Sequence, residues 1–146
     1  DADVGSTWRR RWVALVALLR AVGHVLKKVD GRADPLLAQI ISKEYMKLEN
    51  SRPKPKIFWG FIEKERNLVL KEYRFSASLS GGGTGIHVLC HTTETGELIT
   101  VQANRYHRVT LYLFKDGPFA GKREIDVATE AIQWWKAYLD AIDAQR

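Results

Sequence analysis

Apolar residues recur at helical spacing in four segments of the chain and alternate with polar residues in three shorter segments. The helical period of about 3.6 residues predicts amphipathic helices over residues 7–29, 35–50, 56–73 and 127–144. The period of two predicts β-strands over Ile86–His91, Glu97–Ala103 and Arg108–Phe114. We therefore expect an α+β fold in which four helices pack with a three-stranded antiparallel β-meander over about 86–114. The length of the chain favours one domain, residues 1–146.

The predicted first helix carries a continuous apolar seam on one side and basic residues on the other. The seam residues are spaced alternately by four and three positions, and they are Trp8, Trp12, Leu15, Leu19, Val22, Leu26 and Val29. We expect Ser6 or Thr7 to cap the start of this helix and Asp30-Gly31 to end it. The basic face is a candidate surface for nucleic acid, and it consists of Arg9, Arg10, Arg20, Lys27 and Lys28.

Short polar segments separate the predicted elements. Asp34-Pro35 fits the N-cap and first position of the second helix, and Asp126 fits the N-cap of the last helix. The glycine-rich run at 81–85 lacks the Gly-Lys-Ser/Thr ending of a phosphate-binding loop, so we interpret it as a flexible hinge. We expect Thr95-Gly96 and Asn104-Arg105 to close the two hairpins of the meander.

Composition and charge limit the classes of protein to which the chain can belong. The chain is 45% hydrophobic and 27% charged, with a net charge of +6 that suits either polyanion binding or simple solubility. The most apolar stretch, Trp12–Leu19, is far shorter than the roughly 20 residues that cross a bilayer. The lone Cys90 excludes an intramolecular disulfide, which is typical of a reducing compartment. We therefore expect a cytoplasmic protein with no membrane partner.

No metal site or cofactor is predicted. His87, Cys90, His91 and His107 cluster in the predicted sheet, where we expect surface or sheet-packing roles, with zinc binding or a Cys90 nucleophile as the alternatives. His87 and His91 would share a face of one strand, but positions four apart on a strand are separated by about 13 Å, which is too far to hold one ion together.

Charged residues interrupt the apolar arc of the predicted helix 56–73. Glu65, Arg66 and Glu72 fall within this arc. Because a buried charge is costly unless it is paired, we expect Arg66 to neutralise one of these carboxylates or a charge on another helix. Such a pair fixes helix register or belongs to a functional site. In the second case Glu65 or Glu72 is a candidate general base in a pocket between the sheet and this helix.

The segment Arg66-Asn67-Leu68-Val69-Leu70-Lys71-Glu72-Tyr73 resembles the Arg-Asn-x-x-x-His-x-Tyr signature of HEPN domains. These are compact helical bundles, and many are toxin or defence ribonucleases. The resemblance implies that Arg66 and Lys71 occupy the positions of the arginine and histidine that act on the RNA backbone. Lysine has a much higher ordinary pKa than histidine and is a poor proton shuttle near neutral pH. The resemblance is therefore compatible with a ribonuclease that recruits another base or with a degenerate RNA-binding protein.

Other candidate binding residues are aromatic or basic side chains, which could bind RNA through base stacking and phosphate contacts. We select Trp59, Lys71, Tyr73, Arg105, Tyr106, His107 and Trp134. Trp134 lies at the edge of the last helix's apolar stripe, where it would pack at the core edge, line a pocket or meet a second subunit.

Three functional hypotheses follow from the sequence. The first is a non-catalytic binding or assembly module whose excess apolar surface forms a homodimer. The second is a HEPN-like RNA-binding protein or ribonuclease, and the third is a small enzyme that uses Glu65 or Glu72. The sequence lacks a convincing catalytic set, which favours the first hypothesis.

Overall fold

We describe a computed structural model of the chain. It describes the backbone of residues 2–92 and 98–146 and the side chains of residues 5–80 and 111–146. The helices are α1 (Ala2–Val25), α2 (Gly31–Ala33), α3 (Pro35–Asn50), α4 (Lys64–Glu72) and α5 (Glu124–Asp143). The strands are β1 (Ala77–Thr92) and β2 (Leu98–Phe114). Two π-helical segments, η1 (Leu26–Asp30) and η2 (Ile57–Glu63), continue into α2 and α4, and the 3₁₀ turn η3 spans Gly117–Phe119. The predicted α+β class with four main helical segments is confirmed.

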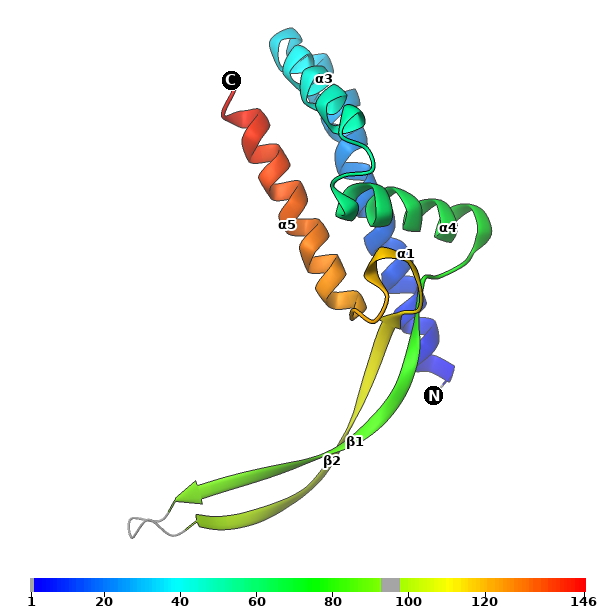
Figure 1. Cartoon of the computed structure of the whole chain (residues 1–146), viewed down its shortest axis with the longest axis vertical. Coiled ribbons are helices and arrows are strands. Elements are labelled where there is room, and N and C mark those ends of the chain that lie inside the picture. Colours follow the sequence, from blue (N-terminus) through cyan, green and yellow to red (C-terminus); the bar gives the residue numbers. More distant parts are fainter. Residues whose placement is uncertain (1, 93–97) are drawn as a thin grey trace.

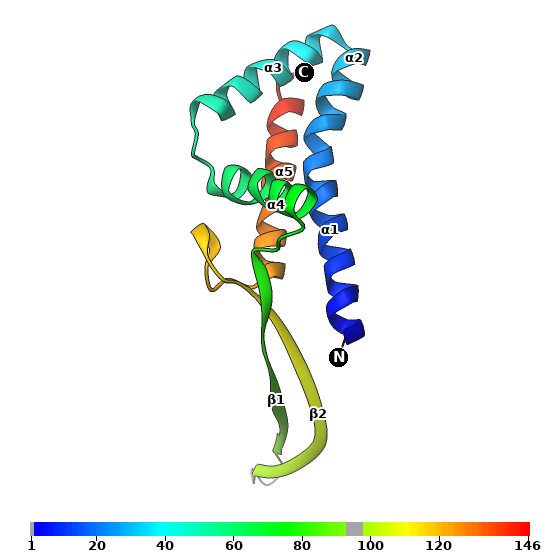
Figure 2. The ribbon, with the colours of Figure 1, turned by 90° about the vertical axis from the view of Figure 1, so that its right-hand side faces the viewer.

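The helices form one part of the molecule, and the two strands form a long hairpin that extends away from them (Figure 1). In the helical part α1 and α5 run along one another, α4 lies across them, and α3 packs at the end far from the hairpin (Figure 2). The N-terminus lies near the base of the hairpin and the C-terminus at the opposite end of the helical part.

The sheet has two described strands, so the predicted three-stranded meander is wrong. β1 and β2 pair antiparallel from Ala77 opposite Phe114 to Thr92 opposite Leu98. The expected turn at Asn104-Arg105 lies within β2. Between the pairs Ile86–Tyr106 and Val88–Gln102, β2 has three residues where β1 has one. The turn signal therefore produces a bulge in a continuous strand.

The predicted hinge at residues 81–85 is also wrong. These residues lie inside β1, where Gly83 is opposite Val109 and Gly85 is opposite His107. Cross-strand pairing of the backbone overrides the low intrinsic preference of glycine for a strand. The other predicted turn, Thr95-Gly96, lies outside the described residues.

The main core forms where α1, η2 and α5 meet next to the base of the hairpin. Its most buried side chains are no more than 1% exposed, and they are Val16, Phe61, Ile62, Val127 and Ala131. The predicted seam of α1 is only partly correct, because Leu15 and Val22 are half-buried and Val29 is 59% exposed. A 3.6-residue helix rotates away from a strict 3.5-residue repeat, and the π-helical turn η1 adds a further shift after Val25.

The predicted helix boundaries have mixed outcomes. Asp34 caps α3 as expected, since its Oδ1 accepts hydrogen bonds from Leu36 N at 2.9 Å and Leu37 N at 3.3 Å. The other predicted caps are wrong, because α1 begins before Ser6 and Thr7, the helical path continues through Asp30-Gly31, and α5 begins before Asp126. Gly31 has an ordinary right-handed backbone (φ −65°), so it does not end the helix.

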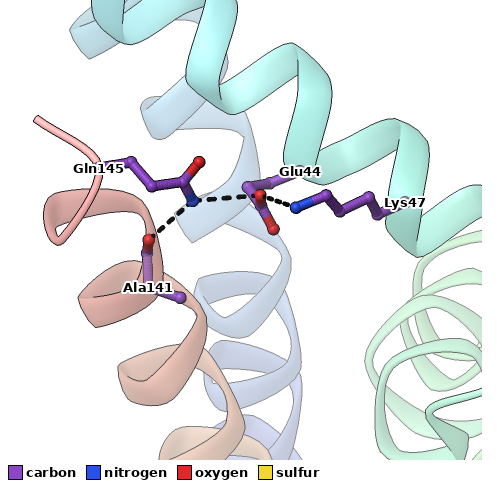
Figure 3. Close-up of polar contacts among 4 residues, drawn as sticks. All are labelled: Glu44, Lys47, Ala141 and Gln145. Atoms are coloured by element: carbon purple, nitrogen blue, oxygen red, sulfur yellow. Dashed lines mark hydrogen bonds and ion pairs between the residues drawn. The ribbon is translucent and has the colours of Figure 1, made fainter.

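A polar contact joins α3 to the C-terminal end of α5 (Figure 3). Glu44 Oε1 accepts hydrogen bonds from Lys47 Nζ at 2.6 Å and from Gln145 Nε2 at 3.1 Å. Gln145 Nε2 also donates to the carbonyl oxygen of Ala141 at 2.9 Å. The hydrogen bond from Lys47, followed by that from Gln145, lowers the pKa of Glu44 below its ordinary value.

Candidate binding cavity

A cavity of about 880 Å³ lies among α1, η1, α3, α4 and α5. This volume falls within the range of natural sites for small ligands. Small side chains leave room on the α1 side, where Ala17, Ala21 and Gly23 line the space. Residues of α3 line the opposite wall, including Ile41, Tyr45 and Leu48. A second, more open depression follows the outer surface of α3 from Gln39 to Asn50.

The charges around the main cavity are mostly positive. The basic lining residues are Arg20, His24, Lys27, Lys28 and Arg66. Glu49 is the acidic residue in this lining. The fold thus brings Arg66, from the HEPN-like segment, together with three members of the predicted basic helix face. Arg9 and Arg10, the other two members of that face, do not line the cavity.

Aromatic rings supply much of the remaining wall. Tyr45, Phe58, Trp135 and Tyr138 all line the cavity. Lys27 Nζ lies 5.4 Å from the centre of the Tyr45 ring, within the distance of a cation–π contact. Burial raises the pKa of Tyr138 to about 12 and also raises the pKa of Tyr45. Both phenols therefore stay neutral near physiological pH and can donate hydrogen bonds to a bound anion.

Close packing of α1 against α5 closes one side of the cavity. A Cβ atom on Gly23 would lie 3.0 Å from the Cη2 atom of Trp135, so glycine permits this approach. Trp135 is 5% exposed, and its Nε1 has no hydrogen-bond partner among the described residues. The Trp135 ring is thus held as a fixed apolar wall.

Arg66 is not paired with Glu65, with Glu72 or with any other carboxylate whose side chain is described, so the predicted ion pair within its own helix is wrong. Its described hydrogen bond runs from Nη1 to Asn67 Oδ1, at 2.9 Å. Its side chain is half-buried at the cavity wall. A cation in this position remains able to bind an anionic ligand.

Glu65 is buried as the sequence predicts, but its partners are neutral. It is 2% exposed, and Oε1 accepts hydrogen bonds from Trp12 Nε1 at 3.0 Å and from the backbone N of Ser76 at 3.1 Å. Glu65 lines neither described cavity. The carboxylate thus connects α4 to α1 and to the segment that leads into β1.

The end of α4 is exposed to solvent. Glu72 pairs with Arg74 at 3.1 Å, and Lys71 is also exposed. Tyr73 ends α4 in the left-handed conformation (φ 50°) and is 68% exposed. The predicted place of Glu72 on the apolar arc is wrong, because this residue lies in the exposed last turn of α4, whereas Glu65 and Val69 are buried.

The two candidate tryptophans pack against neighbouring side chains. Trp59 Nε1 donates to the Lys54 carbonyl oxygen at 3.1 Å, and the Arg52 guanidinium lies 3.6 Å from the centre of its ring. Trp134 is half-buried, with its ring centre 4.9 Å from that of Phe58 and 5.1 Å from that of Tyr138. The expected packing of Trp134 at the core edge is confirmed.

The remaining candidates lie where the structure describes the backbone alone. Arg105, Tyr106 and His107 fall within β2, and the possible metal ligands His87, Cys90 and His91 fall within β1. Their side chains lie outside the described residues. Among the side chains that are described, no group of His, Cys, Asp and Glu is arranged to hold a metal ion. No helix in the described ranges has the length and apolarity needed to cross a membrane.

The cavity contains residues that sequence reasoning missed. Tyr45, His24 and Glu49 were not selected as site residues, although all three line it. The sequence could have identified Tyr45 as a cavity residue, because it lies on the apolar stripe of α3 between Ile41 and Leu48. A tyrosine on a core stripe needs a polar place for its hydroxyl group.

Comparisons with known proteins identify no relative. No protein-family model matches the chain, and no curated protein and no solved structure is significantly similar to it. The geometry of the described residues is therefore the basis for a functional proposal.

Proposed function

We propose that the protein is a non-catalytic binding module that holds a small anionic ligand with an aromatic part in the cavity among α1, α3, α4 and α5. The observation that carries the proposal is the combination of Arg20, Lys27, Lys28 and Arg66 with one acidic residue, Glu49, around the same space. Such an excess of cations in a partly enclosed site attracts an anion strongly, because low-dielectric walls weaken solvent screening.

The aromatic wall supports the second part of the proposal. Phe58 and Trp135 offer apolar ring surfaces, and Tyr45 and Tyr138 offer rings with neutral hydroxyl donors. A planar group of the ligand would stack on these rings while its anionic group contacts the basic residues. A nucleotide and an aromatic sulfonate share this chemistry.

Direct titration tests the proposal. Adenosine monophosphate, anilinonaphthalene sulfonate and inorganic phosphate would be titrated into the protein at low salt by calorimetry. The informative pair of variants is Arg66→Ala, at the cavity wall, and Lys71→Ala, on the exposed side of the same helix. Each variant removes one positive charge from α4.

We expect saturable binding of at least one aromatic anion, weakened about tenfold or more by Arg66→Ala and little changed by Lys71→Ala, as a lost charge-assisted hydrogen bond predicts. Inorganic phosphate should bind more weakly than the aromatic anions because it lacks a group that stacks on the rings. Absence of saturable binding at low salt would overturn the proposal. Equal losses in the two variants would also overturn it, because they would indicate attraction by net charge alone.

A second candidate function is RNA binding, with or without cleavage. The placement of Arg66 beside Arg20, Lys27 and Lys28 supports it, since the HEPN resemblance implies that this arginine acts on an RNA backbone. A salt series with a single-stranded RNA oligonucleotide tests it, because phosphate contacts give affinity that falls steeply with salt. Cleavage that is lost in Arg66→Ala would favour a ribonuclease, and the absence of RNA binding at low salt would exclude this candidate.

A further inference from the structure

Helix α1 has an apolar stripe on the side opposite its core contacts. Leu18 and Val25 are 67% and 45% exposed. Ala14 and Ala21 are also exposed, and they lie beside or between these residues at spacings of three and four positions. At 100° per residue, all four fall within an arc of about 60°. We call Ala14, Leu18, Ala21 and Val25 the outer stripe.

Helix α1 lies at one side of the helical part, with α4 and α5 beside it (Figure 2). The core side of the same helix is occupied by Trp12, Val16 and Leu19. A helix that is apolar on two opposite sides is typical of an element with a neighbour on each side. The described residues supply a neighbour for one side only.

The shape of the outer stripe suits another helix. Small residues at 14 and 21 alternate with larger ones at 18 and 25, at the four-three spacing of a heptad. This pattern forms holes between side chains that can receive the side chains of a facing helix. A membrane-binding stripe usually has larger apolar residues such as Trp, Phe and Leu, whereas the outer stripe contains one leucine, one valine and two alanines.

The charges of α1 indicate which kind of partner helix fits the outer stripe. The segment from residue 4 to residue 29 contains no acidic residue, and its Lys and Arg residues are Arg9, Arg10, Arg11, Arg20, Lys27 and Lys28. Arg11 lies at the edge of the stripe, one turn before Ala14 and two turns before Leu18, and Lys28 follows Val25 in η1. A second copy of α1 would place Arg11 beside Lys28 when antiparallel or beside Arg11 when parallel. Both arrangements are repulsive, so acidic flanks are needed on the partner.

We propose that the outer stripe of α1 docks an acidic amphipathic helix of a partner protein. Apolar side chains of the partner would fill the positions over Ala14 and Ala21, and its flanking carboxylates would pair with Arg11 and Lys28. The outer stripe borders the ligand cavity, because Ala21 and Lys28 also line the cavity, whereas Leu18 and Val25 do not. Substitutions at Leu18 and Val25 therefore test the docking proposal, and Arg66→Ala tests the ligand proposal.

Two synthetic peptides test the proposal. Both would be fluorescently labelled amphipathic helices with leucine at the heptad a and d positions, one with glutamate and one with lysine at the flanking e and g positions. Binding would be followed by fluorescence anisotropy at low and at higher salt. The protein variants are the double substitution Leu18→Glu/Val25→Glu and, as a matched control, Ile132→Glu, which adds a charge at an exposed apolar position of α5 (54% exposed).

We expect the glutamate peptide to bind and the lysine peptide not to bind. The double variant should weaken binding by about tenfold or more while Ile132→Glu leaves it little changed, since an inserted like charge in a docking surface is strongly unfavourable. Far-ultraviolet circular dichroism of each variant must match the original protein, and a single variant Leu18→Ser replaces the double variant if it does not.

Four results would overturn the proposal. The first is absence of glutamate-peptide binding at low salt, and the second is equal binding of both peptides. The third is a concentration-dependent dimer in sedimentation that the double variant abolishes, which would assign the stripe to a second copy. The fourth is binding to phosphatidylserine vesicles that the double variant abolishes, which would assign it to a lipid surface.

Discussion

The carboxylate of Glu65 accepts a hydrogen bond from the indole Nε1 of Trp12 at 3.0 Å, across 53 positions of sequence. The same oxygen, Oε1, accepts the backbone N–H of Ser76 one residue before β1. One buried acceptor thus fixes α1, α4 and the base of the hairpin relative to one another. Trp8 adds to the same junction, because its ring stacks on that of Tyr112 in β2 with the centres 4.0 Å apart.

Removing the Glu65 carboxylate should destabilise the whole fold. Glu65→Ala leaves the Trp12 and Ser76 donors without an acceptor, and we expect a loss of about 2 to 4 kcal/mol in the free energy of unfolding, because an unsatisfied buried polar group costs about 1 to 3 kcal/mol. Glu65→Gln keeps an acceptor oxygen and should lose less. Urea unfolding followed by tryptophan fluorescence measures both.

A double-mutant cycle with Trp12→Phe isolates the contact between the two side chains. If the hydrogen bond is responsible, Glu65→Ala should cost less in the Trp12→Phe background than in the original protein. Equal losses in the two backgrounds would show that the bond between Glu65 and Trp12 contributes nothing to stability.

The sequence predicts the helical part well because each helix carries its own apolar period. The segments 35–50 and 56–73 differ little in extent from α3 and from η2 with α4. The hairpin was harder to predict. Turn-forming residues at 81–85 and at 104–105 are local signals, and continuous pairing between β1 and β2 overrides both. Pairing across the hairpin is a non-local interaction that no single segment reveals.

The cavity could be predicted only in part. The basic residues Arg20, Lys27 and Lys28 were visible as one face of a helix, and Arg66 was visible as a charge on an apolar arc. Their convergence depends on how α4 crosses α1, which helical periodicity does not determine. The helical period of residues 57–72 also does not predict the π-helical turn η2.

Acid should weaken the contact between α3 and the end of α5. The pKa of Glu44 is lowered in the folded protein, first by the hydrogen bond from Lys47 and then by that from Gln145. A depressed folded pKa gives stability that is present above the ordinary value of 4.5 and is lost as pH falls through the folded value. Unfolding free energies measured from neutral to acidic pH should therefore fall more steeply for the original protein than for Glu44→Gln.

A matched variant separates this effect from general acid unfolding. Glu72 is exposed and pairs with Arg74 at the surface, with half of its side chain in solvent. Glu72→Gln should leave the acid dependence close to that of the original protein, because exposed pairs contribute little. An acid dependence that Glu44→Gln leaves unchanged would contradict the role assigned to the contact in Figure 3.

Alkaline pH should lower the stability of the fold through Tyr138 at the cavity wall. Burial raises the pKa of Tyr138 from 10.0 to about 12, so the folded protein keeps the phenolic proton at pH values where the unfolded chain has lost it. The sign follows from linkage: the stability of the fold declines as pH rises from 10.0 towards 12. Tyr138→Phe removes this decline, so the variant should gain stability relative to the original protein across that interval.

Tyr73→Phe, at a 68% exposed position, should show no relative gain, and chemical unfolding at stepwise increasing pH measures all three proteins. A constant difference between the original protein and Tyr138→Phe over this interval would show that Tyr138 does not titrate as a buried phenol.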